Sequence, residues 1–146
     1  MEENTSNFAT RGVLSVKCKD NLWQPVAFIL KVFNETEKNY EIHDKEMLGV
    51  IRCLEAWRHF LEGARIKFEV WTNHKNLEYF MTSQNLNCRQ ARWALYLSRF
   101  DFLLRHVLGS KMRKADGLDR RSDWEKGGEG DNEEKTLLKL ECIKSI

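Results

Sequence analysis

Residues 42–73 read IHDKEMLGVIRCLEAWRHFLEGARIKFEVWTN. The first part repeats apolar residues at helical spacing, and Gly63 marks its end because glycine readily closes a helix. The second part, 66–72, is an apolar-rich run of strand length. A long helix that leads into a buried strand indicates a crossover, so this stretch decides the fold class. The side of the helix predicted to face the core carries Ile42, Leu48, Ile51, Leu54, Trp57 and Leu61.

The flanking segments extend this pattern in both directions. Residues 12–18 alternate apolar and polar positions, and 22–33 form a second predicted strand after a KDN turn signal, with Pro25 near its start. Residues 89–100 predict an amphipathic helix with Ala91, Leu95 and Tyr96 on or near its core side. A strand over 101–107 and a short helical turn over 115–121 complete the prediction. This order predicts an α/β fold with a mixed sheet and helices on one or both of its faces.

Charge is distributed unevenly along the 146 residues, although the formal net charge is only +2. Residues 86–121 hold nine Lys and Arg against three Asp, a local net of +6, whereas 125–134 have a local net of −4. A length of 146 residues and a hydrophobic content of 42% indicate a single domain with a sizeable core. A basic segment followed by an acidic tail favours a nucleic-acid surface over a membrane surface. The alternative is an ordinary solvated basic face.

The cysteines and the termini indicate a reduced, intracellular protein, either cytoplasmic or nuclear. No two of the four cysteines, Cys18, Cys53, Cys88 and Cys142, stand at metal-ligand spacing. The opening MEENTSN is polar and acidic, unlike a signal peptide. No apolar run approaches the ~20 residues that a membrane-spanning helix needs.

Several long motifs, in order, resemble one family. NYEIHDKEMLGVIRCLEAWRHFLEGA, FEVWTNHKNLEYF, LNCRQARWALYLSRFDF and KADGLDRR resemble the ribonuclease H domain of gypsy-type LTR retrotransposon polyproteins, particularly fungal ones. SNFATRGVLS resembles that domain's first hairpin. The resemblance runs from about Glu2 to Arg121, so 1–121 is the predicted domain. Residues 122–146 are the predicted acidic linker towards an integrase-side segment.

The resemblance implies a ribonuclease H-like fold, with a mixed five-stranded sheet flanked by helices. It also implies a hydrolase that cleaves the RNA strand of RNA–DNA hybrids with two Mg²⁺ or Mn²⁺ ions. Two dications ~4 Å apart repel each other, so such a site needs several negatively charged oxygen ligands. The implied partners are nucleic acid and the reverse transcriptase and integrase portions of a polyprotein, with no membrane.

The family's four metal-binding carboxylates fall on four positions of this chain. Its first-strand aspartate falls on Asn4 in EENTS, and its helix glutamate falls on Glu46 in DKEML. The aspartate that ends the fourth strand falls on Asn73 in WTNHK, and the last one falls on Asp116 in ADGLDRR. Two carboxylates therefore remain, and we expect weak metal binding, strongly impaired cleavage, and convergence of the four residues at one end of the sheet.

Each of these residues also has a purely structural interpretation. Glu46 suits the first turns of a helix, where the dipole favours an acid, and Asp116 suits a helix cap. His74 and His106 invite a catalytic role but more often serve structure, and Trp93 and Tyr96 favour packing over base stacking. Phosphate contacts in the family picture would come from Arg89, Arg92, Arg99, Arg105, Lys111, Arg113 and Lys114.

The leading interpretation is therefore a member of an enzyme family whose metal site is degenerate. The alternative is a non-catalytic module that binds nucleic acid or a partner protein. A third possibility is a relic without selected function. The retained basic segment is compatible with all three.

Overall fold

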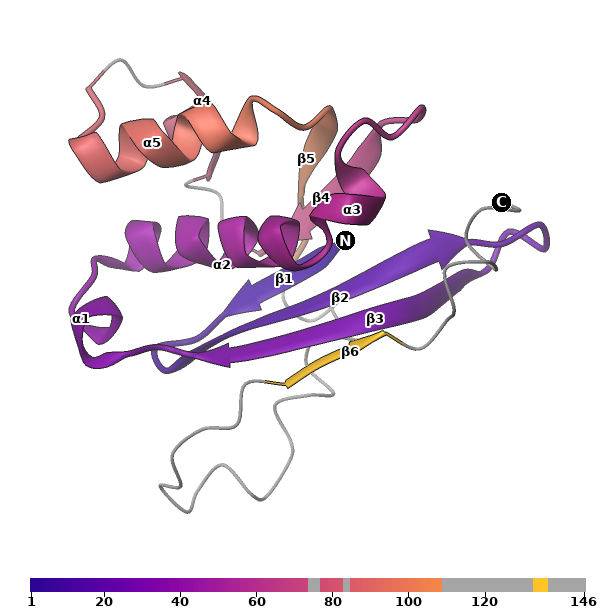
Figure 1. The fold of residues 1–146 in the computed structure, drawn as a ribbon, viewed down its shortest axis with the longest axis horizontal. Helices are drawn as coiled ribbons and strands as arrows, with labels where there is room; N and C mark the ends of the chain where they lie inside the picture. The colour runs from indigo at the N-terminus through magenta and orange to yellow at the C-terminus, as the bar shows by residue number, and fades with distance from the viewer. Residues whose placement is uncertain (74–76, 83–84, 109–132, 137–146) are drawn as a thin grey trace.

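The computed structural model describes residues 1–73, 77–82, 85–108 and 133–136 (Figure 1). The elements follow in the order β1 (Glu2–Thr5), β2 (Ala9–Lys17), β3 (Trp23–Val32), α1 (Glu35–Lys38), α2 (Ile42–Ala56), α3 (Arg58–Leu61), β4 (Phe68–Thr72), α4 (Leu77–Thr82), α5 (Cys88–Leu97), β5 (Phe102–His106) and β6 (Glu133–Thr136). The predicted short helix over 115–121 lies outside the described residues. No helix within the described ranges is long and apolar enough to cross a bilayer.

One mixed sheet joins all of the described strands in the order β5-β4-β1-β2-β3-β6. β1 runs parallel to β4, and β4 runs parallel to β5, whereas the β1–β2, β2–β3 and β3–β6 pairs are antiparallel. The predicted α/β class with a mixed sheet and flanking helices is confirmed. The sheet also contains β6, which pairs with the outer edge of β3 and comes from the segment predicted as an acidic linker.

β2 and β3 form a long hairpin that projects past the rest of the sheet (Figure 1). Its turn closes where the amide of Cys18 donates to the carbonyl of Leu22 at 2.9 Å, and Asn21 adopts a φ of 63°. Asparagine tolerates this left-handed conformation better than most residues. Pro25 lies beside a shift in the β2–β3 register, where the missing N–H disturbs the ladder least.

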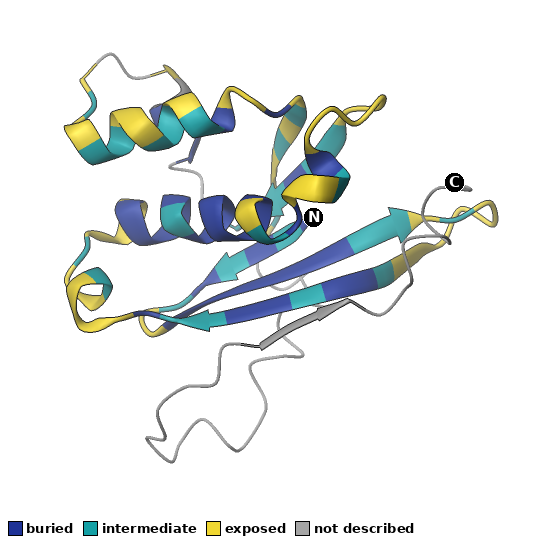
Figure 2. Cartoon of the chain, in the orientation of Figure 1, coloured by how far each residue is buried: buried dark blue, intermediate teal, exposed yellow. Residues whose placement is uncertain are grey.

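α2 lies against the sheet along its buried side (Figure 2). The single helix predicted from residue 42 to Gly63 is wrong in its length, because α2 ends at Ala56 and α3 begins at Arg58. Trp57 lies between them, leaves helical geometry and is fully buried. Burying that large ring in the core bends the chain at this position. Ile42 was also wrongly placed on the core side, since it is 45% exposed.

α5 covers α2 rather than the sheet itself (Figure 1). It begins with a capping box, in which Asn87 accepts from the amide of Gln90 and the Gln90 side chain accepts from the amide of Asn87. Leu97 and the following Phe100 are buried, whereas Leu95 is 72% exposed. Ala91 is exposed too, so the predictions of Ala91 and Leu95 as core-side residues are wrong, and Leu97 lies on that side instead.

Candidate functional site

Asn4 lies in β1, and Asn73 follows the end of β4, which runs parallel to β1. In the β1–β4 pair, Glu3 lies opposite Thr72. Asn4 follows Glu3 in the sequence, and Asn73 follows Thr72. Neighbouring strands are ~4.8 Å apart, and side chains alternate between the faces of a sheet. Because Glu3 contacts Thr72 on the α2 side, alternation along β1 places Asn4 on the opposite face, whereas Asn73 lies beyond the end of β4. The structure thus brings these two predicted site residues together.

Glu46 lies on α2, which packs over β1, and only 3% of it is exposed. Gly49, three residues later on the same side of the helix, lies against the side chains of Glu3 and Thr5. Glu46 therefore belongs to the helix face that covers the end of β1. Asp116 lies outside the described residues, so the convergence of all four positions stays a prediction.

Glu3 is a polar residue of this site that the sequence analysis missed. Its side chain is fully buried, accepts a hydrogen bond from the Thr5 hydroxyl, and accepts a second from the Thr72 hydroxyl at 3.2 Å. Room for its carboxylate exists because Gly49 has no Cβ there. The available signal was strand alternation, because an acid next to the outward-facing Asn4 must point inward. Glu3 also raises the pKa of the Cys53 thiol, although burial of that thiol is the larger cause.

The Asn73 side chain presents an unused acceptor. Its Oδ1 is shielded from solvent and has no hydrogen-bond partner among the described residues, while its backbone oxygen lies 3.1 Å from His106 Nε2. The amide of Val107 donates to the carbonyl of Thr72 at 2.8 Å, which ties the end of β5 to the end of β4. His106 therefore borders the site, whereas His74 lies outside the described residues.

Two of the four predicted metal-ligand positions, Asn4 and Asn73, carry neutral amide side chains. Over the described ranges, no group of three or more His, Cys, Asp or Glu side chains is placed to hold a metal. Amide oxygens such as Asn73 Oδ1 can accept a hydrogen bond or contact a cation, but they carry no formal charge to offset two dications. The described part of the site is a polar edge with two neutral amides and two neighbouring buried glutamates, Glu3 and Glu46.

Comparison with known protein families identifies the family to which this chain belongs. Residues 1–100 match the family described as the RNase H-like domain found in reverse transcriptase. The chain belongs to this family. Its mixed sheet, its long helix over β1 and its polar strand ends are the RNase H-like architecture.

Related proteins place this RNase H-like domain among retrotransposon sequences. Two of them are the Transposon Tf2-3 and Tf2-4 polyproteins of Schizosaccharomyces pombe. Each is 37% identical to the chain over 125 residues, which cover 84% of this chain and 9% of the polyprotein. The chain thus spans about a tenth of the length of these relatives.

Solved structures share the fold at low sequence identity. The foamy viral protease-reverse transcriptase in complex with RNA/DNA hybrid matches with a TM-score of 0.54 at 17% identity, over 73% of this chain and 14% of that one. The same viral protein in complex with dsDNA matches with a TM-score of 0.56 at 15% identity, over 74% of this chain and 23% of that one. At these identities the likeness supports the RNase H-like fold alone.

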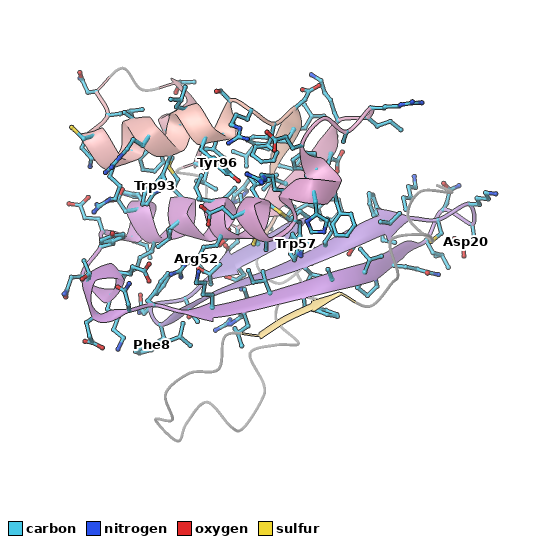
Figure 3. All side chains as sticks on the ribbon, in the orientation of Figure 1. Phe8, Asp20, Arg52, Trp57, Trp93 and Tyr96 are labelled. Carbon is cyan, nitrogen blue, oxygen red and sulfur yellow. The ribbon has the colours of Figure 1, made fainter. Side chains whose placement is uncertain are left out.

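Arg89 of the RNase H-like domain is engaged inside the molecule. Its guanidinium pairs with Asp44, which is buried in the first turn of α2, and lies 3.9 Å from the ring centre of Tyr40. Gln90 donates to the same carboxylate at 2.9 Å. Figure 3 shows Trp93 between α5 and α2, where Arg89 also stacks on it. The expected packing role of Trp93 agrees with this contact, and Arg89 fastens α5 to α2.

Arg99 and Arg105 are also paired with acids. Arg99 contacts Glu62 at 2.5 Å, and Arg105 contacts Glu69 at 2.8 Å. The pKa of Glu69 is lowered, chiefly by the hydrogen bond from Trp71, with Arg105 acting in the same direction against burial. Together with the Arg89–Asp44 pair, these two pairs give an acid partner to three of the four arginines that the structure describes in the basic segment.

Arg92 differs from these arginines. It is exposed on α5 and forms no ion pair with a described residue. The other predicted phosphate contacts, Lys111, Arg113 and Lys114, lie outside the described residues.

Proposed function

We propose that this RNase H-like domain binds RNA–DNA hybrid within a gypsy-type retrotransposon polyprotein and cleaves the RNA strand very poorly. One observation carries the proposal: Glu3 and Thr72, the residues that precede Asn4 and Asn73, are paired across β1 and β4. Support for the ligand comes from the foamy viral protein of the same fold, which was solved with RNA/DNA hybrid. Support for the setting comes from the Tf2 polyproteins.

The weak cleavage follows from charge. Two Mg²⁺ or Mn²⁺ ions bring four positive charges, which the family's four carboxylates would balance. Asparagine at positions 4 and 73 leaves Glu46 and Asp116, which halves the negative charge. An amide ligand cannot offset the repulsion between the ions, so metal binding weakens and the attacking water is no longer activated.

A second candidate function is a non-catalytic module that holds a partner protein, such as the reverse transcriptase or integrase portion of an intracellular polyprotein. The ion pairs of Arg89 and Arg99 favour it, because cations already bound to Asp44 and Glu62 attract phosphates less. Such a domain would keep the RNase H-like fold but would not bind RNA–DNA hybrid as part of its function.

Cleavage of a labelled RNA–DNA hybrid in Mg²⁺ and in Mn²⁺ tests the proposal. We expect slow or no cleavage by the unmodified chain, and a rise of orders of magnitude in the Asn4→Asp/Asn73→Asp double variant. Each tenfold change in rate corresponds to about 1.4 kcal/mol of transition-state stabilisation. The matched control adds Glu46→Gln to the double variant and should abolish the regained cleavage. Robust Mg²⁺-dependent turnover by the unmodified chain, lost on Glu46→Gln alone, would contradict the proposal.

Binding measured in EDTA separates the two candidates. Non-specific affinity comes mainly from phosphate contacts, so hybrid binding should persist without metals and weaken steeply as salt rises. Absence of binding to hybrid at low salt would favour the partner-protein module.

A further inference from the structure

The tip of the β2–β3 hairpin carries a second cluster of basic and apolar side chains. Lys17 ends β2, Lys19 lies in the turn, and both are exposed. Figure 3 labels Asp20 at this tip, far from the α1 end of the hairpin. Asp20 accepts from the amide of Leu22 at 3.2 Å, so its carboxylate holds the turn.

The two lysines differ in their pairing from three of the four described arginines of the basic segment, and resemble the fourth, Arg92. Neither Lys17 nor Lys19 forms an ion pair with a described residue, whereas Arg89, Arg99 and Arg105 each contact an acid. Counterions therefore remain around the hairpin lysines, and their release on binding an anion contributes to affinity. The segment 17–19 is thus a stronger candidate for phosphate contact than its small local charge suggests.

Apolar side chains lie beside these lysines. Leu22 is 63% exposed and Trp23 is 44% exposed. Trp23 is the cross-strand partner of Lys17, and its ring packs edge-on against Trp71 with 6.1 Å between ring centres. The contact with Trp71 fixes the Trp23 ring while leaving part of it open to solvent. Exposed aromatic rings next to lysines are typical of surfaces that contact sugars and bases.

The cluster lies on the same face of the sheet as Asn4. Trp23 is the cross-strand partner of Lys17 and packs against Trp71, and Trp71 is the β1–β4 partner of Glu2, which shares the face of Asn4 by alternation. Lys17 is six residues beyond Arg11, the cross-strand partner of Asn4. Six residues of an antiparallel strand span ~20 Å. Along a duplex the same length holds about six phosphates of one strand, at ~3.4 Å each. A hybrid that reaches from the strand ends to the hairpin therefore needs about six base pairs or more.

We propose that Lys17, Lys19 and Trp23 form a second nucleic-acid contact, which grips the duplex about six base pairs from the Asn4–Asn73 end. This inference rests on the proposed hybrid binding and adds a contact outside the basic segment 86–121. The lysines would meet phosphates, and the Trp23 ring would lie against a sugar.

Fluorescence anisotropy on two hybrid stems, each closed by a linker and of about 4 or about 18 base pairs, tests the inference. For the long stem, Lys17→Ala/Lys19→Ala should reduce the slope of log affinity against log salt by about two units. Trp23→Ala should weaken binding at every salt concentration without changing this slope, because no counterion is involved. For the short stem, neither variant should change the affinity.

The matched control is Lys38→Ala/Lys67→Ala, which removes two exposed lysines that pair with Glu35 and Asp101. It should change the slope much less than the hairpin pair. Equal effects of the two double variants, or equal effects on both stems, would overturn this inference and leave the proposed function intact. Failure of the unmodified chain to bind either stem would overturn both. Thermal unfolding of each variant shows whether Trp23→Ala folds; a misfolded variant is replaced by Trp23→Leu, which removes the ring but keeps an apolar side chain against Trp71, with the same expected loss.

Discussion

Gly49 lies where α2 comes closest to β1. A Cβ at this position would overlap the carboxylate of Glu3 and the hydroxyl of Thr5, and both of those side chains are buried. Neither has a solvent-exposed route of escape. Because Gly49 has no Cβ, there is space for the buried side chain of Glu3, the second residue of the central strand β1.

Gly49→Ala should lower the free energy of unfolding by about 1–3 kcal/mol, the usual cost of overpacking a core. Adding Glu3→Thr should recover much of this loss, because the shorter side chain vacates the space. Urea unfolding of the two single variants and the double variant measures the coupling directly. Additive effects would show that Glu3 and Gly49 do not compete for the same space.

Cys53 predicts a pH dependence. Its thiol is fully buried, and its pKa is raised by burial first and by the charge of Glu3 second. Above the ordinary thiol pKa of ~8.5 the unfolded chain loses this proton while the native chain keeps it. Stability should therefore fall as pH rises, by up to about 1.4 kcal/mol per pH unit from this group.

Urea unfolding between about pH 7 and pH 10 measures this fall, with Cys53→Ala as the reference that lacks the thiol. The unmodified chain should lose more stability over that range than the variant does. Parallel pH profiles for the two proteins would show that the thiol does not contribute.

For single residues, the sequence indicated that Asn73 follows a strand, because the apolar run 66–72 precedes it, but it did not indicate the orientation of Glu3. Asn4 was placed in the first strand only through the family resemblance. The Glu3 environment depends on Thr72 and Gly49, which are distant in sequence. Only the folded chain brings those three residues together.

Among the elements, α5 depends most on polar contacts for its position. Asp44 of α2 accepts from both Arg89 and Gln90, and Arg89 stacks between Tyr40 and Trp93. A guanidinium can hold a carboxylate and an aromatic ring at once because it is planar. The helix is therefore fixed at its first turn.

Arg89→Lys should lower the free energy of unfolding by about 1–3 kcal/mol, since an ammonium group loses both the forked contact and the ring stacking. The affinity for RNA–DNA hybrid should not change, because the Arg89 guanidinium is already paired with Asp44. Chemical unfolding and anisotropy of the same preparation measure both quantities. Unchanged stability together with weaker hybrid binding would instead support the predicted phosphate contact of Arg89.

Charge counting along the sequence identified a basic segment but could not show its pairing. Arg99 meets Glu62 and Arg105 meets Glu69 across elements that are more than thirty residues apart. The sequence also did not indicate the helix break at Trp57, because the break depends on packing in the folded chain. Its apolar spacing continues the pattern of α2, and only the shape of the core decides where the ring is placed.

Across the whole molecule, β6 extends the sheet on the β3 side. It pairs with Ala27, Phe28, Ile29 and Leu30, in the middle of β3. Without this strand, the amides and carbonyls along that edge would be open to water or to another chain. The segment 133–136 is thus connected to the sheet, although its composition predicted a solvated linker.

A chain that ends at Arg121, the predicted domain boundary, should fold but should unfold at lower urea concentration than the full chain. It should also exchange the amide hydrogens of 27–30 faster, because their β6 partners are absent. Hydrogen exchange and urea titration of both lengths measure these effects. Identical midpoints and identical exchange would support 1–121 as a complete unit.

The first residue is held inside the sheet. The α-amino group of Met1 donates to the carbonyl of Glu69 at 2.8 Å, the amide of Trp71 donates back to Met1, and the residue is 8% exposed. Amine-directed dyes should therefore react slowly at this position. An affinity tag fused to Met1 would have to extend from the start of β1, which lies between β2 and β4 in the sheet. For the fluorescence measurements, a maleimide dye on the exposed Cys88 at the start of α5 is the better choice.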